Sequence, residues 1–159
     1  MPRVGRKRSD RRWLDPSGNE WASRYEWETY EHLRAGGTTV RKCDSSDTIT
    51  YREPKRGCIC LECGSSDVVQ KRKYTPDLYI VPKGREECDG YYIEVKGYFR
   101  GEKRRLFRCL RNDRPDIDIR VVSYNNAKTG KLTLVEYFER YLKTTPIVVG
   151  YQAIPEEWL

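Results

Sequence analysis

The chain has 159 residues, which is enough for one domain with a modest hydrophobic core. Hydrophobic residues make up 37% of it and 12 residues are tyrosine, more than an intrinsically disordered chain carries, so we expect it to fold. Lys and Arg outnumber Asp and Glu by 31 to 24. This excess favours a polyanionic partner, although a merely soluble basic protein has the same balance.

Membrane insertion and secretion are not indicated. No run approaches the roughly 18 apolar residues that a membrane span needs, and no apolar signal region opens the sequence. We therefore expect a cytoplasmic protein, whose six cysteines are thiols or metal ligands rather than disulfides. The only histidine, His32, counts against mechanisms that need several, such as those of HNH nucleases.

Residues 1–16 are predicted to form a basic, flexible arm, and residues 17–159 a single domain. Asp10 is the only acid among residues 1–12. A basic segment of this kind can lie along the phosphates of bound DNA, and a solvated tail is the alternative. The candidate DNA-binding residues of the arm are Arg6, Lys7 and Arg8.

The domain is predicted to begin with a helix over residues 17–33. Ser17 and Glu20 have the spacing of a capping box, in which each side chain accepts from the backbone near the other. Gly36 and Gly37 follow as a stop signal, because glycine readily takes the left-handed conformation that ends helices.

A cysteine-rich insertion is predicted at about residues 43–66. Cys60 and Cys63 stand two residues apart before a glycine, in the compact turn of a zinc knuckle. A structural zinc needs four ligands, and Cys43 and Cys58 are the nearest candidates to complete it, with Cys88 able to replace either. The zinc would staple a segment that buries little by itself. A cluster of free thiols is the alternative.

Two short apolar runs are predicted to be neighbouring strands, Leu78–Val81 and residues 91–95. Both are rich in β-branched and aromatic residues and are bounded by Pro or Gly. Because side chains alternate along a strand, Glu94 and Lys96 project from one face. If the strands pair antiparallel, Asp77 before the first comes level with Glu94 and Lys96 at the end of the second.

Asp77, Glu94 and Lys96 form a set suited to hydrolysis of a phosphodiester. Carboxylates are preferred ligands of Mg²⁺ or Mn²⁺, and Mg²⁺ usually takes one or two of them together with water and substrate phosphate. A lysine beside the metal can orient the attacking water or offset charge that develops on the phosphate. A strand that merely displays charged residues to solvent is the alternative.

A basic helix is predicted over residues 101–112, stopped by Pro115. Leu106, Cys109 and Leu110 are expected on its inner side. Its basic residues lie close to the carboxylates in sequence and are expected to hold a phosphate backbone. With the residue before the helix, these candidates are Arg100, Lys103, Arg104, Arg105 and Arg108.

The remaining elements complete the prediction of an α/β fold. Residues 117–124 are predicted to be a strand, so a strand, a helix and a second strand form a parallel crossover. A last helix over 134–142 and a short extended segment at 147–149 follow. An antiparallel pair joined to a parallel crossover gives a mixed central sheet, which we expect to be flanked by helices.

These motifs resemble the signature of the PD-(D/E)XK nucleases, whose positions are taken by Pro76, Asp77, Glu94 and Lys96. The wider sequence is similar to the bacteriophage endonuclease I family of Holliday-junction resolvases. The likeness runs in order along most of the chain from about residue 20. It takes in residues 23–26, 74–77, 94–97, 100–108, 115–122 and 154–159.

The resemblance implies a restriction-endonuclease-like core and a magnesium-dependent endodeoxyribonuclease that acts on branched DNA in recombination. Asp77 and Glu94 would bind the metal, with the backbone carbonyl of Val95 as a further ligand. Lys96 would position or activate water, and Glu26 in the first helix would complete the site. Residues 38–69, which include the cysteine-rich segment, depart from the family, and a zinc held there by cysteines alone would be structural, since no open position is left for water.

The resemblance also implies a homodimer whose chains exchange segments, so Glu26 would act in cis or in trans. Glu28 and Glu31 lie close enough in sequence to confuse the helical register. A glutamate that follows the first helix in the family is not evident here. If a phage encodes the chain, its location is the host cytoplasm. The alternatives are a restriction-type or transposase-associated nuclease, and a zinc-containing DNA-binding protein without catalysis.

Overall fold

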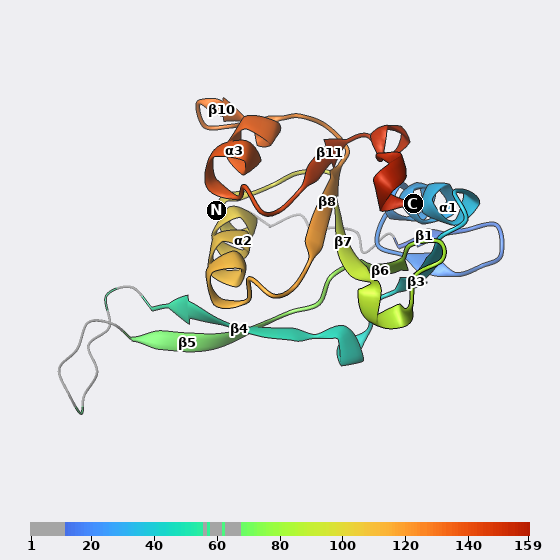
Figure 1. Ribbon diagram of the computed structural model, residues 1–159. Coiled ribbons are helices and arrows are strands. Elements are labelled where there is room, and N and C mark those ends of the chain that lie inside the picture. Colours follow the sequence, from blue (N-terminus) through green and yellow to red (C-terminus); the bar gives the residue numbers. More distant parts are fainter. Residues whose placement is uncertain (1–11, 56, 58–61, 63–67) are drawn as a thin grey trace, which may run out of the picture.

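The computed structural model describes residues 12–55, 57, 62 and 68–159 (Figure 1). Its centre is a five-stranded sheet in the order β11-β8-β7-β6-β3. Strand β7 pairs in parallel with β8 and antiparallel with β6, so the sheet is mixed, and the predicted α/β class with a mixed sheet is confirmed. The five strands are β3 (Thr39–Lys42), β6 (Leu78–Val81), β7 (Tyr91–Lys96), β8 (Ile119–Ser123) and β11 (Ile147–Val149).

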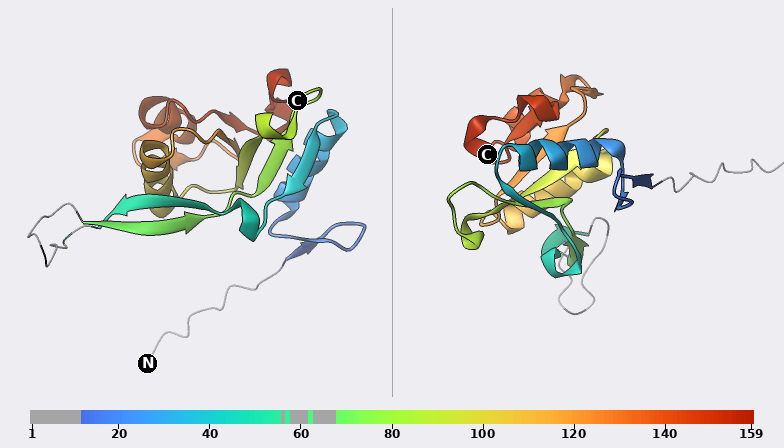
Figure 2. Two further views of the ribbon diagram at one scale, coloured as in Figure 1. Left: turned by 60° about the horizontal axis from the view of Figure 1, so that its bottom comes forward. Right: turned by 90° about the vertical axis from the view of Figure 1, so that its right-hand side faces the viewer.

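Helices cover both faces of this sheet (Figure 2). One face packs on α1 (Arg24–Ala35), and its core includes Leu33, Ile80 and Ile93. The other face carries α2 (Gly101–Asp113) and α3 (Leu134–Tyr141). Because successive residues of β7 point to opposite faces, Ile93 enters the α1 core while Tyr92 packs on the α2 side.

A long hairpin extends from the sheet beneath α2 (Figure 1). Its strands are β4 (Ile49–Pro54) and β5 (Val69–Tyr74), which pair antiparallel from the Ile49 end to the Pro54 end. Alternate residues of β4 are buried, so the hairpin adds its own apolar face to the core under α2. Arg105 of α2 also bonds to Glu53 at 2.8 Å, which ties the helix to the hairpin.

The predicted start of the first helix is wrong. Ser17 and Glu20 do not cap a helix. They belong to a small hairpin of β1 (Trp13–Leu14) and β2 (Glu20–Trp21), with Ser17 in the connection and Glu20 in β2. Strand β1 lies in the segment that was predicted to be the flexible arm. The Asp15 carboxylate accepts from the backbone N–H of Ser17 at 2.9 Å, and so favours a turn over a helical start. Helix α1 begins at Arg24 instead.

The true cap of α1 is Ser23, whose hydroxyl accepts from the backbone N–H of Glu26 at 3.1 Å. The predicted stop is confirmed, since α1 ends at Ala35 and Gly37 has a φ of 89°. Three-turn helices with a single buried face are common, and here that face consists of Glu26, Thr29 and Leu33. A carboxylate in that buried row is unusual and needs an explanation.

The later elements agree with the sequence in type and order. The predicted strand after α2 and the extended segment at 147–149 are β8 and β11, which pair in parallel. Phe107 was missed as a core residue of α2: it is fully buried, as is Leu110, while Leu106 and Cys109 are only partly buried. Two short strands, β9 (Lys128–Thr129) and β10 (Leu132–Thr133), form a hairpin before α3.

No helix among the described residues is long and apolar enough to cross a membrane.

Candidate active site

Asp77 lies where the ends of β6 and β7 meet. The register pairs Leu78 with Ile93, so the predicted antiparallel arrangement of these strands is confirmed. The backbone N–H of Asp77 donates to the carbonyl of Ile93 at 3.2 Å, and its carboxylate accepts from the N–H of Val95 at 2.7 Å. Asp77 immediately precedes β6, and its side chain therefore extends the hydrogen bonding between β6 and β7 by one further bond, to the N–H of Val95.

Lys96 stands between the two predicted metal-binding carboxylates. Its Nζ is 2.8 Å from Glu94 Oε1 and 3.3 Å from Asp77 Oδ2. Glu94 and Lys96 are two residues apart on β7, so they share a face as expected. The side chains of Lys96 and Asp77 remain 24% and 21% exposed, whereas that of Glu94 is 1% exposed. Asp77 and Lys96 thus border solvent, while Glu94 forms the floor.

Glu94 receives two further donors that the sequence analysis did not assign to it. The hydroxyl of Tyr74, the last residue of β5, donates to Glu94 Oε2, and the Nζ of Lys103 in α2 lies 3.1 Å from Oε1. Burial raises the pKa of Tyr74 well above 10, so the phenol stays a donor. An aromatic residue three positions before Asp77 was the available signal, but only the folded hairpin brings it to Glu94.

Glu26 faces the same cluster from the first turn of α1. It is 6% exposed, and burial raises its pKa, while the charges of Lys42 and Lys96 oppose that rise. The charge of Glu26 in turn contributes to the raised pKa of Asp77. Within the chain, the charge of Glu26 is therefore coupled to those of Asp77 and Lys96.

The two alternatives to Glu26 are used elsewhere. Glu28 pairs with Arg24 at 2.8 Å, and Glu31 lies 3.6 Å from Arg34. Both are pairs along the solvent side of the helix, of the kind common at spacings of three and four residues. The register therefore singles out Glu26 as the acid that α1 turns inward.

Crowding of carboxylates changes the acidity of the site. Burial, and then the charge of Glu94, raise the pKa of Asp77 to about 7, against the opposing charge of Lys96. Burial alone would lower the pKa of Lys96, but the charges of Glu94 and Asp77 outweigh it and leave the pKa raised. Lys96 is consequently a permanent cation at neutral pH, and Asp77 is poised between its two forms.

The donor set fits a divalent cation by charge and by chemistry. Asp77 and Glu94 are hard oxygen ligands. The backbone N–H of Val95 points at Asp77, and in an extended strand the carbonyl of a residue points to the same side as its N–H, so the Val95 carbonyl also points towards Asp77. Within the described residues, no group of three or more His, Cys, Asp or Glu side chains has the arrangement of a metal site. The lysine occupies the space between the two carboxylates instead.

The predicted DNA-binding residues of α2 separate into three roles. Lys103 contacts Glu94, and Arg105 bonds to Glu53 and to the carbonyl of Pro54 at 2.8 Å. Arg104 and Arg108 line a cleft on the side of α2 that faces α3. Arg100 is the exposed N-cap residue of the helix. The three arm residues Arg6, Lys7 and Arg8 lie outside the described residues.

The predicted zinc site is only partly within the described residues. Cys58, Cys60 and Cys63 fall outside them. Cys43 has a half-buried side chain, and burial raises the pKa of its thiol to about 12. Its backbone N–H donates to the carbonyl of Asp77 at 3.0 Å. Cys43 lies before β4, at the Ile49 end of the hairpin. Zinc binding, with Cys43 as one of its ligands, stays a prediction.

Comparison with known proteins assigns no relative to the chain: no model of a known protein family and no curated protein matches it.

Proposed function

We propose that the chain is a metal-dependent DNA endonuclease with a restriction-endonuclease-like core, of the Holliday-junction-resolving endonuclease I type. The observation that carries this proposal is the convergence of Asp77, Glu94 and Lys96 at the ends of two adjacent strands. Acids crowded together at a buried or partly buried site are costly for folding even with lysine partners, so the cluster is better explained by chemistry than by stability.

The roles follow from the positions of the groups. Asp77, Glu94 and the carbonyl of Val95 would hold Mg²⁺ or Mn²⁺. Bound there, such a metal would lower the pKa of its water and offset negative charge on the phosphate. Lys96, at the solvent edge, would release its bond to Asp77 and orient the attacking water. The product strand would carry a 5′-phosphate.

The residues around this set would act by positioning. Tyr74 and Lys103 hold both oxygens of Glu94, so its carboxylate is fixed before substrate arrives. Glu26 would bring a further carboxylate to the metal or to its water from α1. Since Glu26 already faces the cluster of its own chain, the proposal does not depend on exchange of segments.

The substrate preference rests on the sequence resemblance. It points to branched DNA, above all four-way junctions, cut by a homodimer that presents two sites. The net charge of +7 supports a polyanionic substrate in general terms. A structural zinc in the cysteine-rich segment and residence in the cytoplasm belong to the same proposal.

The test compares a labelled four-way junction with a linear duplex of matched sequence, with Mg²⁺ present. Wild type is expected to make paired nicks near the crossover. Asp77→Asn and Glu94→Gln keep the size of the side chains and are expected to bind the junction but to lose cleavage by a factor on the order of 10² to 10³ or more. Asp116→Asn, an exposed residue paired with Arg114, is the matched control.

Two results would contradict the proposal at different levels. If wild type cuts the linear duplex as well as the junction, the junction preference is wrong and a restriction-type or transposase-associated nuclease remains. If wild type binds DNA but cuts neither substrate with any divalent metal, the chain is a DNA-binding protein with an inactive site.

A further inference from the structure

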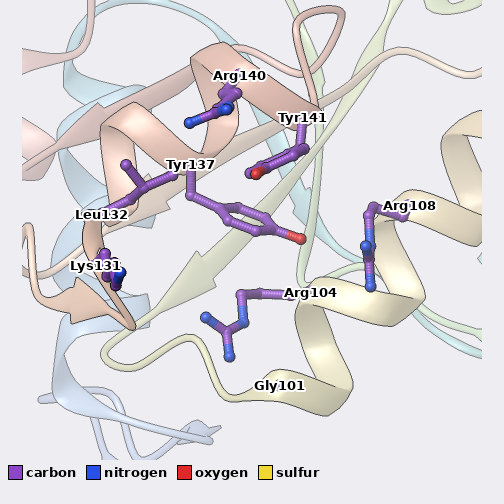
Figure 3. Close-up of a pocket in the computed structure, with 8 residues that line it drawn as sticks. All are labelled: Gly101, Arg104, Arg108, Lys131, Leu132, Tyr137, Arg140 and Tyr141. Atoms are coloured by element: carbon purple, nitrogen blue, oxygen red, sulfur yellow. The ribbon is translucent and has the colours of Figure 1, made fainter.

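A second candidate site lies on the other side of α2, in a cleft of about 490 Å³ between α2, α3 and the β9–β10 turn (Figure 3). A volume of this size is in the usual range for pockets that hold small organic ligands rather than single ions. We call it the basic cleft. Its lining residues are Gly101, Arg104, Arg108, Lys131, Leu132, Tyr137, Arg140 and Tyr141.

The charges of the basic cleft are all of one sign. Arg104 and Arg108 are four residues apart on α2, so they share a face, and Arg140 and Lys131 approach from α3 and from the β9–β10 turn. Among the described residues that line it there is no Asp or Glu. Several cations that face one concave space without a lining carboxylate create a field that favours an anion.

Other basic residues of α2 are differently engaged. Lys103 lies 3.1 Å from Glu94, and Arg105 lies 2.8 Å from Glu53. In the basic cleft the contacts of the guanidinium groups include aromatic rings: Arg104 is 5.5 Å from the ring centre of Tyr137. A guanidinium over a ring keeps hydrogen-bond donors that a phosphate can use.

The two tyrosines supply a surface for a flat group. Their ring centres are 5.0 Å apart, and Tyr137 extends from α3 towards α2 with its hydroxyl between the two helices (Figure 3). Tyr137 is buried, whereas Tyr141 is 50% exposed at the end of α3. An exposed ring beside phosphate-binding cations is the usual arrangement for stacking an unpaired base.

The basic cleft is close to the candidate active site along α2. Lys103, which contacts Glu94, and Arg104, which lines the cleft, are consecutive residues in the first turns of the helix. Consecutive helical residues point about 100° apart. A nucleic-acid strand that crosses the beginning of α2 would therefore meet the carboxylates on one side and the cleft on the other.

We propose that the basic cleft binds one nucleotide of a DNA strand, with a phosphate held by Arg104, Arg108, Lys131 and Arg140 and an unpaired base against Tyr141. This inference rests on the proposed function, since DNA is taken as the substrate. It adds that the substrate includes an unpaired or unstacked nucleotide near the cleavage position, which junctions and other branched molecules provide and a perfect duplex does not.

The test measures binding without metal, so that it does not depend on cleavage. Fluorescence anisotropy of labelled single strands and junctions is followed over a range of salt for wild type and for Lys131→Ala/Arg140→Ala, both exposed positions. Loss of two phosphate contacts is expected to raise the Kd on the order of tenfold or more at 0.1 M salt, and to reduce the slope of log K against log salt by about 2.

The matched control removes the same charge from the connection between β6 and β7. Lys83→Ala/Arg85→Ala changes two exposed cations, of which Lys83 bonds through its backbone N–H to Leu159, and neither lines the basic cleft. It is expected to keep the wild-type slope. Tyr141→Ala is expected to weaken binding of a normal single strand several-fold and that of an abasic strand of equal length hardly at all.

The outcomes separate the two proposals. Equal slopes for the cleft and control variants would overturn the cleft proposal, whether or not wild type cuts junctions. A reduced slope without any cleavage would keep the cleft and overturn the nuclease assignment. A loss seen only with strands that carry a 5′-phosphate would identify the bound group as a terminal phosphate, whereas equal loss with and without it would identify a backbone phosphate.

Discussion

The carboxylate cluster and the basic cleft flank the same helix but are built in opposite ways. Glu94 is 1% exposed and each of its oxygens has a donor, and Lys96 bonds to both Glu94 and Asp77. Lys131 and Arg140 in the cleft are exposed, and no carboxylate is among the described residues that line the space they face. Charges in the cluster are therefore part of the balance that folds the protein, whereas the exposed cations Lys131 and Arg140 of the cleft can be reached by a ligand from solvent.

This difference predicts a graded cost when cations are removed. Lys96→Met leaves two crowded carboxylates without their shared partner, and is expected to lower the free energy of unfolding at pH 8 by about 3–5 kcal/mol. Lys103→Met removes the contact with Glu94 and the ammonium that lies 5.2 Å from the ring centre of Tyr74, from a side chain that is 35% exposed, and should cost less. Chemical denaturation measures both.

Arg140→Met in the basic cleft is the variant whose stability is compared with that of Lys96→Met. Arg140 is a surface cation with no carboxylate partner among the described residues, and its removal is expected to change stability by less than about 0.5 kcal/mol. Equal costs for Lys96→Met and Arg140→Met would mean that the cluster is not electrostatically coupled to folding. Mg²⁺ is expected to recover none of the loss in Arg140→Met.

The second prediction uses the raised pKa of Asp77. The unfolded chain has this group near its usual 3.8, and the folded protein near 7. Between these values the folded state holds a proton that the unfolded state has lost. The contribution of Asp77 to the free energy of unfolding is therefore fully present below pH 4 and is lost as the pH rises to about 7. The fall attributable to Asp77 is at most about 4 kcal/mol, since each pKa unit corresponds to about 1.4 kcal/mol.

Asp77→Asn removes that titration and keeps an oxygen that can accept from Val95. The free energy of unfolding of the metal-free variant is expected to fall less than that of wild type between pH 4 and 7, with the raised pKa of Glu26 still contributing, and to exceed that of wild type at pH 8. Mg²⁺ at pH 8 should raise the Tm of wild type and leave that of Asp77→Asn unchanged. Parallel pH profiles for the two proteins would contradict the raised pKa.

The cluster and the cleft also differ in how far the sequence predicts them. Asp77, Glu94 and Lys96 were placed correctly because strand alternation and one antiparallel pair determine their positions. Tyr74 and Lys103 were not assigned to Glu94, because they come from a hairpin and a helix whose packing no local pattern specifies. The basic cleft is formed only when α2, α3 and the β9–β10 turn come together. The sequence analysis therefore named Arg104 and Arg108 as DNA-binding residues but did not predict a cleft.

The error at the first helix has a local cause. Ser17 and Glu20 satisfy the spacing of a capping box, but Asp15 also bonds to the backbone of Asn19 at 2.9 Å, and Gly18 adopts a φ of 84°. Two competing turn signals therefore overrode one helix signal. Glu26 was named from the family resemblance, which does not depend on where the helix starts, and it lies on the buried face of α1 with Leu33.

The third prediction concerns the phenol that holds Glu94. Tyr74→Phe removes a donor to a buried carboxylate and leaves Lys96 and Lys103 in place. The expected loss of stability is about 1–3 kcal/mol, as for hydrogen bonds to charged groups. Tyr141→Phe in the basic cleft, where the ring is half exposed, is the control and should be neutral. An equal effect of the two substitutions would show that Tyr74 is not needed to satisfy Glu94.

The smallest expected effects come from the residues that cap α1 and α3. Ser23 caps α1, which carries Glu26, and Thr133 caps α3, which lines the basic cleft; each hydroxyl accepts from the N–H three residues later, at 3.1 and 3.3 Å. Ser23→Ala and Thr133→Ala are each expected to cost about 1 kcal/mol. The change in stability alone therefore does not distinguish them.

The pH profile does distinguish them. The charge of Glu26 contributes to the raised pKa of Asp77, so loosening the first turn of α1 should bring that pKa back towards its usual value. Ser23→Ala is then expected to lose less stability between pH 4 and 7 than Thr133→Ala, although both start from the same deficit at low pH. If the two profiles stay parallel, Glu26 does not act on Asp77, and its proposed part in the metal site fails with it.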